Sequence, residues 1–193
     1  MPFVRGFKTW CENTSKNLRR ELGLASSDPM DSFSLAAHMG VTVWQAEEVP
    51  GVDKKTLNTL LRDDPESWSA LTVHAGAMHA VILNSTHSGG RPASNLAHEL
   101  AHMILDHAPA RVDVSEDGLL MLQSFDRLQE DEATWLAGCL LLPRVALAAS
   151  DGAGNSIRTI AKRFGVSPGM VKYRLNVTGV NAQRRAAIRK GDG

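Results

Sequence analysis

The stretch NLAHELAHMIL, residues 95–105, decides how the whole chain is interpreted. It contains the pattern HExxH as His98-Glu99-Leu100-Ala101-His102. On a helix, positions i and i+4 share one face about 5–6 Å apart, so two imidazoles can bind one Zn²⁺ at about 2.0–2.1 Å. Glu99 is rotated by about 100° from His98 and can reach a water at the metal without being a ligand. The pattern therefore predicts metal-assisted peptide hydrolysis.

HExxH also occurs by chance, and the alternative is a pair of hydrogen-bonded core histidines. The flanking residues favour the metal, because they are apolar on most sides and predict a buried helix over about 93–106. Two histidines and a glutamate inside a buried helix are costly unless they are paired or bind a metal. We expect His98 and His102 to be metal ligands and Glu99 to be the catalytic base.

Length and composition exclude several classes of protein. A chain of 193 residues with 43% hydrophobic residues suits one domain, or one domain with a small appendage. Cys11 and Cys139 are far apart and give no disulfide framework, which fits a reducing cytoplasm. The N-terminus has no apolar signal core, and no run of about 18 apolar residues predicts a membrane span. We therefore expect a cytoplasmic protein with no membrane contact.

Charge is distributed unevenly along the chain. Residues 1–150 hold 12 Lys and Arg against 19 Asp and Glu, a balance of −7, whereas residues 151–193 hold 9 against 2, a balance of +7. Residues 151–155, DGAGN, form a break. We expect a metallopeptidase body over 1–150 and a basic helical segment over 151–193. The basic segment fits an acidic partner or nucleic acid, or docking on the acidic body of its own chain.

Periodicity and turn signals predict a mostly helical chain with a few strands. A glycine between strands 67–73 and 77–83 indicates a hairpin. The second of these strands directly precedes the HExxH helix, so we expect it to form the edge of the cleft, where an extended substrate can pair. Residues 156–175 predict a helix, a tight turn and a second helix. The remaining helices are expected over 3–22, 31–39, 53–61 and about 125–142, and one further strand over 41–45.

A hydrolytic zinc needs a third protein ligand. His107 is near in sequence, but it falls about 140° from the ligand face of a continuing helix and misses the spacing of the metzincin pattern. The acidic cluster at residues 130–132 is favoured, because a second helix packed on the first can deliver a carboxylate. His79 and His87 are spare histidines, for which surface or hydrogen-bonded roles are the ordinary reading.

The HExxH motif and the later run EDEATWLAGCLLLP, residues 130–143, together resemble the ImmA/IrrE family of bacterial metallopeptidases. In that family an HExxH helix is followed by a run of the type E-x-E-A-N-x-F-A-x-x-L-L-M-P, and the resemblance covers about residues 5–176. It implies a zincin-like α+β fold, mostly helical, with a small antiparallel sheet of about three strands flanking the HExxH helix and a C-terminal helix-turn-helix-like pair. It also implies that Glu130 is the third ligand and that Glu132 is not a ligand. Three positions depart from the family pattern: Ala101 for Gly, Thr134 for Asn and Leu136 for Phe.

The resulting hypothesis is a zinc endopeptidase, with Mn²⁺ and Fe²⁺ as weaker candidates for the metal. The resemblance implies that the substrate is a helix-turn-helix transcriptional repressor, whose cleavage derepresses stress or mobile-element genes. Two other classes stay open: a DNA-binding regulator acting through residues 156–176, and a toxin-like component of a two-gene system that acts by binding. DNA binding is not favoured, because the second helix offers few polar contacts. A further group should stabilise the transition state, and the candidates are His79, Arg91, Tyr173 and Arg174.

Overall fold

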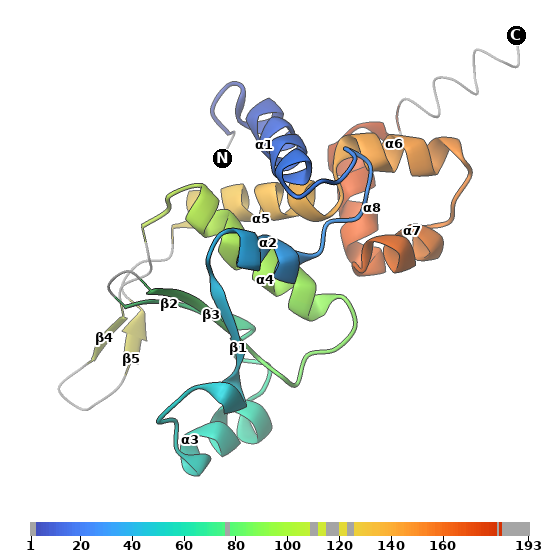
Figure 1. Cartoon of the computed structure of the whole chain (residues 1–193). Coiled ribbons are helices and arrows are strands. Elements are labelled where there is room, and N and C mark those ends of the chain that lie inside the picture. Colours follow the sequence, from blue (N-terminus) through green and yellow to red (C-terminus); the bar gives the residue numbers. More distant parts are fainter. Residues whose placement is uncertain are drawn as a thin grey trace, which may run out of the picture.

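The described part of the chain is mostly helical, with one small sheet and one short hairpin (Figure 1). The computed structural model describes residues 3–75, 78–108, 112–114, 120–122, 126–180 and 182. This arrangement confirms the predicted α+β class. The helices are α1 (Phe7–Glu21), α2 (Ser32–His38), α3 (Lys54–Asn58), α4 (Arg91–Ile104), α5 (Arg127–Leu141), α6 (Arg144–Gly152), α7 (Ile157–Phe164) and α8 (Pro168–Val177). The strands are β1 (Thr42–Gln45), β2 (Ala70–Ala75), β3 (Met78–Leu83), β4 (Val112–Val114) and β5 (Leu120–Leu122).

The three-stranded sheet has the order β1-β3-β2 and is mixed. β2 and β3 form the expected antiparallel hairpin, with Thr72 opposite Val81. β1 pairs parallel to β3, so the prediction of an antiparallel sheet was only partly correct. The long connection through α3 allows a parallel pair, which a tight hairpin cannot form.

β3 lies in the middle of the sheet, so the prediction that an extended substrate can pair with it at the edge of the cleft was wrong. Its residues Ala80, Val81 and Leu83 are almost fully buried, which suits a strand flanked on both sides. β2 and β1 are the edge strands of this sheet. β2, which pairs with β3, therefore has an edge that could accept an extended peptide.

The sequence interpretation missed α6. Pro143 begins this helix, since its carbonyl accepts a hydrogen bond from the Leu147 amide at 3.1 Å. Proline fits the start of a helix, where its missing N–H has no intrahelical partner to lose. α6 runs to Gly152 and so includes the first two residues of the break expected at 151–155.

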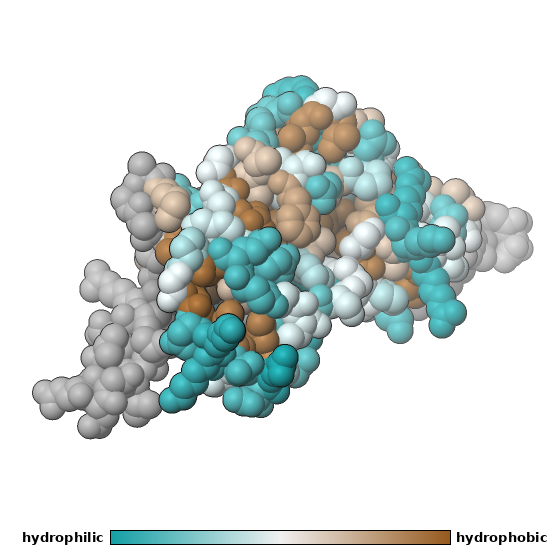
Figure 2. Space-filling view, turned by 60° about the horizontal axis from the view of Figure 1, so that its bottom comes forward, coloured by the Kyte–Doolittle hydropathy of each residue, from teal (hydrophilic) through white to brown (hydrophobic). Residues whose placement is uncertain are grey.

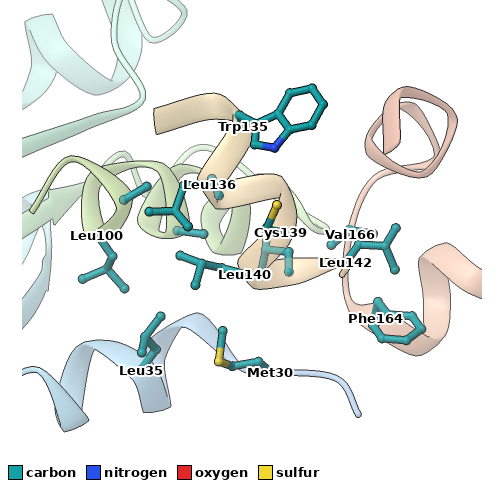
Figure 3. Packing of buried hydrophobic residues seen from close by; sticks show 14 of the residues in the cluster. Met30, Leu35, Leu100, Trp135, Leu136, Cys139, Leu140, Leu142, Phe164 and Val166 are labelled. Carbon is teal, nitrogen blue, oxygen red and sulfur yellow. The ribbon is translucent and has the colours of Figure 1, made fainter. Parts of the chain in front are cut away.

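α5 forms the centre of the hydrophobic core, between α1 and α4 (Figure 1). Every residue from Trp135 to Leu141 is buried. Figure 3 shows the side chains of α5 between Leu100 of α4 and Leu35 of α2 on one side and Phe164 and Val166 on the other. Cys139 is fully buried there, as expected for a small core residue. The packing of α5 on α4 fixes the two helices that carry the acidic cluster and the HExxH motif.

The C-terminal end of α5 is capped by side chains from other helices. The last carbonyls of a helix have no intrahelical donor and must be satisfied elsewhere. Donors from α1 and α8 reach them, so two distant segments hold this end of α5. The hydrogen bonds run from Ser15 Oγ to Cys139 O (2.6 Å), from Arg19 Nη2 to Leu140 O (2.7 Å) and from Arg174 Nε to Leu142 O (3.0 Å).

An ion pair joins the same two segments. Arg174 of α8 is fully buried, and its Nη2 donates to Glu12 Oε1 of α1 at 2.7 Å. The other Glu12 oxygen accepts from the Arg144 amide at 3.0 Å. One carboxylate of α1 therefore binds both α8 and the start of α6.

The turn between α7 and α8 packs on the start of α4. A Cβ placed on Gly90 would lie 2.7 Å from the Gly165 carbonyl oxygen and 2.8 Å from the carbonyl carbon of Val166. Only glycine permits this approach of two backbones. Gly165 ends α7 with a φ of 63°, and Ser167 caps α8 by accepting from the Met170 amide, as expected for a helix, turn and helix.

Within the described residues, no single helix is long and apolar enough to span a membrane. α5 and α6 reach that length and apolarity only when counted together, with a bend of 49° between them. On the face shown in Figure 2, hydrophobic residues form separate patches between hydrophilic ones. The large exposed hydrophobic side chains come from different elements: Val4, Trp10, Phe33, Leu71, Met78 and Val145.

Candidate metal centre

His98, His102 and Glu130 converge between α4 and α5, and we call them the metal-centre group. His98 Nε2 lies 3.1 Å from Glu130 Oε2 and 3.1 Å from His102 Nε2. His102 Nε2 lies 3.4 Å from Glu130 Oε1. The two histidines are one turn apart on α4, and Glu130 extends from the first turn of α5, which Asp126 caps. The structure thus brings together the three residues expected to be ligands.

The chemistry and spacing of the metal-centre group fit a divalent cation. Ligand atoms of a tetrahedral zinc at about 2.0–2.1 Å lie roughly 3.3–3.4 Å from one another. The two histidine nitrogens are 3.1 Å apart, and they lie 3.1 and 3.4 Å from different oxygens of Glu130, which is close to that edge length. The side chains are 22–38% exposed, so the group is accessible to solvent. Two imidazoles and one carboxylate are also a donor set typical of catalytic zinc.

His102 is held in the neutral form that can bind a metal. Burial, followed by the nearby His98, lowers the pKa of His102 from its ordinary value of 6.5 to about 4, although Glu130 opposes the shift. A metal ligand must offer an unprotonated nitrogen. The site therefore presents its lone pair without first having to lose a proton near neutral pH.

Glu99 follows His98 on α4, and its carboxylate is hydrogen-bonded to the sheet. Its Oε2 accepts a hydrogen bond of 2.6 Å from the hydroxyl of Thr72 on β2. This bond orients the carboxylate beside the metal-centre group without making it part of the group. The position fits a proton acceptor for water, as predicted for Glu99.

His107 and Glu132 lie behind His102. His107 Nδ1 is 3.0 Å from His102 Nδ1, and His107 Nε2 is 3.2 Å from Glu132 Oε2. His107 therefore contacts the metal-centre group without belonging to it, consistent with its rejection as a third ligand. Sequence analysis had assumed a continuing helix and did not anticipate this contact.

Of the four candidates for stabilising the transition state, His79 is on the relevant face of the sheet. Side chains alternate along a strand, so His79 shares a face of β3 with Val81, the cross-strand partner of Thr72. That is the face from which Thr72 reaches Glu99. Arg91 lies about 10 Å before His98 along α4, and it forms an exposed ion pair with Glu66 at 2.9 Å.

Tyr173 and Arg174 lie near the other end of α5. Tyr173 Cε1 would be 3.7 Å from a Cβ on Gly138, about 12 Å along the helix from Glu130, and burial raises the pKa of Tyr173. Arg174 donates to Leu142 O, about 18 Å along the helix from Glu130, and to Glu12. The prediction that Arg174 stabilises the transition state is therefore corrected: its guanidinium is committed to structural contacts.

His87 is buried and lies outside the metal-centre group. Its Nδ1 is 3.2 Å from the side-chain nitrogen Nδ2 of Asn95 on α4. Burial, followed by the charge of Arg91, lowers the pKa of His87. This placement agrees with the ordinary reading of His87 as a hydrogen-bonded histidine.

Thr72 and His107 are the two contacts of the site that sequence analysis missed. Thr72 is a single hydroxyl on a strand, and only the register of the sheet directs it to Glu99. A signal for His107 was available in the sequence, because it follows His102 by only five residues. The helix geometry that argued against His107 as a ligand gave no indication that its ring contacts His102.

Comparison with protein families decides the relationship that the motifs suggested. The family described as the IrrE N-terminal-like domain, Peptidase M78, matches residues 56–176, more than half of the chain. The chain belongs to this family. The resemblance read from the HExxH motif and the run 130–143 is thereby confirmed.

The fold of this IrrE-like chain has a counterpart among solved structures. A Mycobacterium tuberculosis transcriptional regulator is similar with a TM-score of 0.54 and 19% identity, over 90% of this chain and 47% of that chain. At this identity the likeness concerns the fold, and the chain spans about half the length of the regulator. No curated protein matches the chain.

Proposed function

We propose that this chain is a zinc-dependent endopeptidase with a zincin-like site. His98, His102 and Glu130 would hold the metal, and Glu99 would be the catalytic base. The convergence of the three ligand atoms within 4.8 Å of one another, beside a carboxylate held separately, carries the proposal. Membership of a peptidase family supports it.

The residues of the chain divide the chemical work. When bound, zinc supplies a Lewis acid that polarises the peptide carbonyl and acidifies a water molecule. Glu99 takes a proton from the attacking water and returns it to the leaving amine, while the Thr72 hydroxyl keeps its carboxylate oriented. His79 is our candidate for stabilising the negative charge on the carbonyl oxygen, since it extends from the same sheet face.

The edge of β2 offers a place for the substrate backbone. β2 supplies Thr72 to the site and, among the residues that the structure describes, is an edge strand in the order β1-β3-β2. An extended peptide can add to such an edge through main-chain hydrogen bonds. This arrangement would place the scissile bond near Glu99.

Substitution of Glu99 by Gln tests the catalytic scheme. The variant should retain one equivalent of zinc by elemental analysis, because Glu99 is not a ligand, while peptide cleavage falls by at least a hundredfold. Glu66→Gln, an exposed carboxylate paired with Arg91, is a matched control with unchanged cleavage. Full activity in Glu99→Gln would refute the scheme.

The substrate we propose is a helix-turn-helix transcriptional repressor, met in the cytoplasm and cut to derepress stress or mobile-element genes. The support is family membership and the motif resemblance, together with a solved fold relative described as a transcriptional regulator. Incubation with a repressor encoded by the neighbouring gene, with and without chelator, tests it. Single-site cleavage that stops on chelation is expected, and an uncut repressor with zinc bound would contradict it.

A DNA-binding regulator is the second candidate, because α7 and α8 carry exposed cations. The sequence from residue 152 to 180 contains no Asp or Glu. Binding through phosphates would weaken steeply with salt, so a gel shift at 50 and 200 mM salt distinguishes it from the peptidase proposal. The exposed cations are Arg158, Lys162, Arg163 and Lys172.

A further inference from the structure

Two side chains continue inward from the metal-centre group. His102 is followed by His107 at 3.0 Å and then by Glu132 at 3.2 Å. The His107 side chain is 7% exposed and the Glu132 side chain 17%, so both are less exposed than the metal-centre group at 22–38%. Water therefore competes less for these hydrogen bonds than it would at an exposed site.

The acceptor at the inner end determines where the protons are. A carboxylate oxygen only accepts hydrogen bonds, so His107 Nε2 must carry the proton that it shares with Glu132. In a neutral imidazole the other nitrogen is then an acceptor. His107 Nδ1 consequently accepts from His102 Nδ1, which leaves the His102 Nε2 lone pair pointing at His98 and Glu130.

The backbone holds His107 in this position. α4 ends at Ile104, and Asp106 adopts a φ of 54°, the left-handed region that non-glycine residues seldom enter. This turn brings the chain back, and the His107 amide donates to the His102 carbonyl at 3.0 Å. His107 is thus bound to His102 through both its backbone and its ring.

We propose that Glu132 and His107 form a positioning relay that fixes the tautomer and orientation of His102 as a metal ligand. The relay rests on the zinc site of the proposed function and adds two residues to it. Groups that hydrogen-bond to ligating histidines typically contribute 10- to 100-fold to metal affinity. Here the support is extended, because a second imidazole lies between the ligand and the carboxylate.

Zinc affinity, measured by competition with a chromophoric chelator, tests the relay independently of cleavage. His107→Phe keeps an aromatic ring but no acceptor, and it should bind zinc about 10- to 100-fold more weakly. His107→Asn restores an acceptor near the Nδ1 position and should recover part of the affinity. Glu132→Gln keeps an acceptor without the charge and should fall between wild type and His107→Phe.

Asp131→Asn is the matched control. It removes the neighbouring negative charge on α5, and its zinc affinity should stay within about twofold of wild type if a specific hydrogen bond matters. An equal loss in Asp131→Asn and Glu132→Gln would mean that the relay acts only as nearby charge, and would overturn the proposal. Circular dichroism of the metal-free proteins checks folding; if His107→Phe unfolds, the proposal is decided by His107→Asn and Glu132→Gln.

Nitrogen-15 spectra of the zinc-loaded, histidine-labelled protein give a second measurement. His107, assigned from the spectrum of His107→Asn, should appear as the Nε2–H tautomer and His102 as the Nδ1–H tautomer. An Nδ1–H tautomer for His107 would overturn the relay.

The two proposals fail in different ways. Zinc binding by wild type with unaltered affinity in His107→Asn and Glu132→Gln would overturn the relay and leave the peptidase proposal intact. If the His107 and Glu132 variants bind zinc more weakly as expected but wild type cleaves no peptide, the relay is upheld and the peptidase proposal is refuted. A wild-type chain that binds no zinc would overturn both.

Discussion

The orientation of Glu99 depends on one hydroxyl from β2. Thr72 donates to Glu99 Oε2 at 2.6 Å, and the two residues are 27 positions apart in sequence. A catalytic carboxylate is effective only when it is held within hydrogen-bond reach of the proton it accepts. The hydrogen bond from Thr72 thus connects the sheet to the proposed catalytic base.

Thr72→Val removes this hydroxyl and keeps the β-branched shape. We expect kcat/KM for peptide cleavage to fall about tenfold, equivalent to about 1.4 kcal/mol, because Glu99 loses its orienting donor. Zinc affinity should not change. Thr42→Val on the exposed part of β1 is the control, and equal losses in the two variants would argue against a specific role of Thr72.

The pKa of His102 predicts how the metal-free protein responds to acid. Burial and His98 lower that pKa from 6.5 to about 4, so between these values the unfolded chain binds a proton that the folded chain does not. The free energy of unfolding contributed by this group should be fully present above pH 6.5. It should decrease as pH falls from about 6.5 to about 4 and stay level below that.

Urea unfolding of the chelator-treated protein at several pH values between 7 and 4 measures this dependence. In His102→Asn the slope across that range should be shallower than in wild type. A slope unchanged by the substitution would assign the acid sensitivity to other groups.

At the scale of elements, local patterns predicted the helices better than their pairing. The i, i+4 histidines and the apolar flanks located α4, and the acidic run followed by apolar residues located α5, each within about two residues of its bounds. The strand β1 was also predicted, but its parallel partner was not, since strand direction depends on a crossover that no local pattern records. α6 was missed because Pro143 was interpreted as a possible end of a helix.

The site residues were also predicted only as far as local sequence patterns determine them. The histidine spacing on α4 is local, so His98 and His102 could be proposed as ligands from the sequence, whereas the choice of Glu130 within the acidic cluster 130–132 needed the family resemblance. The contacts of Thr72 and the placement of Arg174 depend on long-range packing. No pattern of spacing within one helix or strand contains that information.

The contact between the α7–α8 turn and the start of α4 can be tested at Gly90. Gly90→Ala would place a methyl group 2.7 Å from the Gly165 carbonyl oxygen, so one backbone must shift. We expect a loss of about 1–3 kcal/mol in the free energy of unfolding, measured with urea.

Gly152→Ala at the end of α6 is the control, because a Cβ there meets no atom within 4 Å. It should change stability by less than about 1 kcal/mol. If Gly90→Ala is equally mild, the two backbones separate easily and the helix pair is only loosely attached to α4.

At the scale of the whole molecule, Glu12 joins segments from both ends of the chain. Its carboxylate binds Arg174, which lies 162 positions later and is fully buried. Removing one partner of a buried ion pair leaves an uncompensated charge and typically costs 3–5 kcal/mol.

Glu12→Ala should therefore lower the free energy of unfolding by about 3–5 kcal/mol, measured by urea denaturation. The double variant Glu12→Ala with Arg174→Met should recover part of that loss, because the buried cation is gone. A double variant no more stable than Glu12→Ala would show that packing, not charge, dominates at this position.

The capping of α5 by α1 also affects which shortened forms of the protein can fold. The family match begins at residue 56, and a protein cut to residues 56–176 would appear to hold every proposed catalytic residue. It would lose Ser15 and Arg19, the donors to the last turn of α5, and the carboxylate that neutralises Arg174. Expression boundaries drawn from the family match would therefore yield a weakened fold, and a recombinant protein should begin ahead of α1.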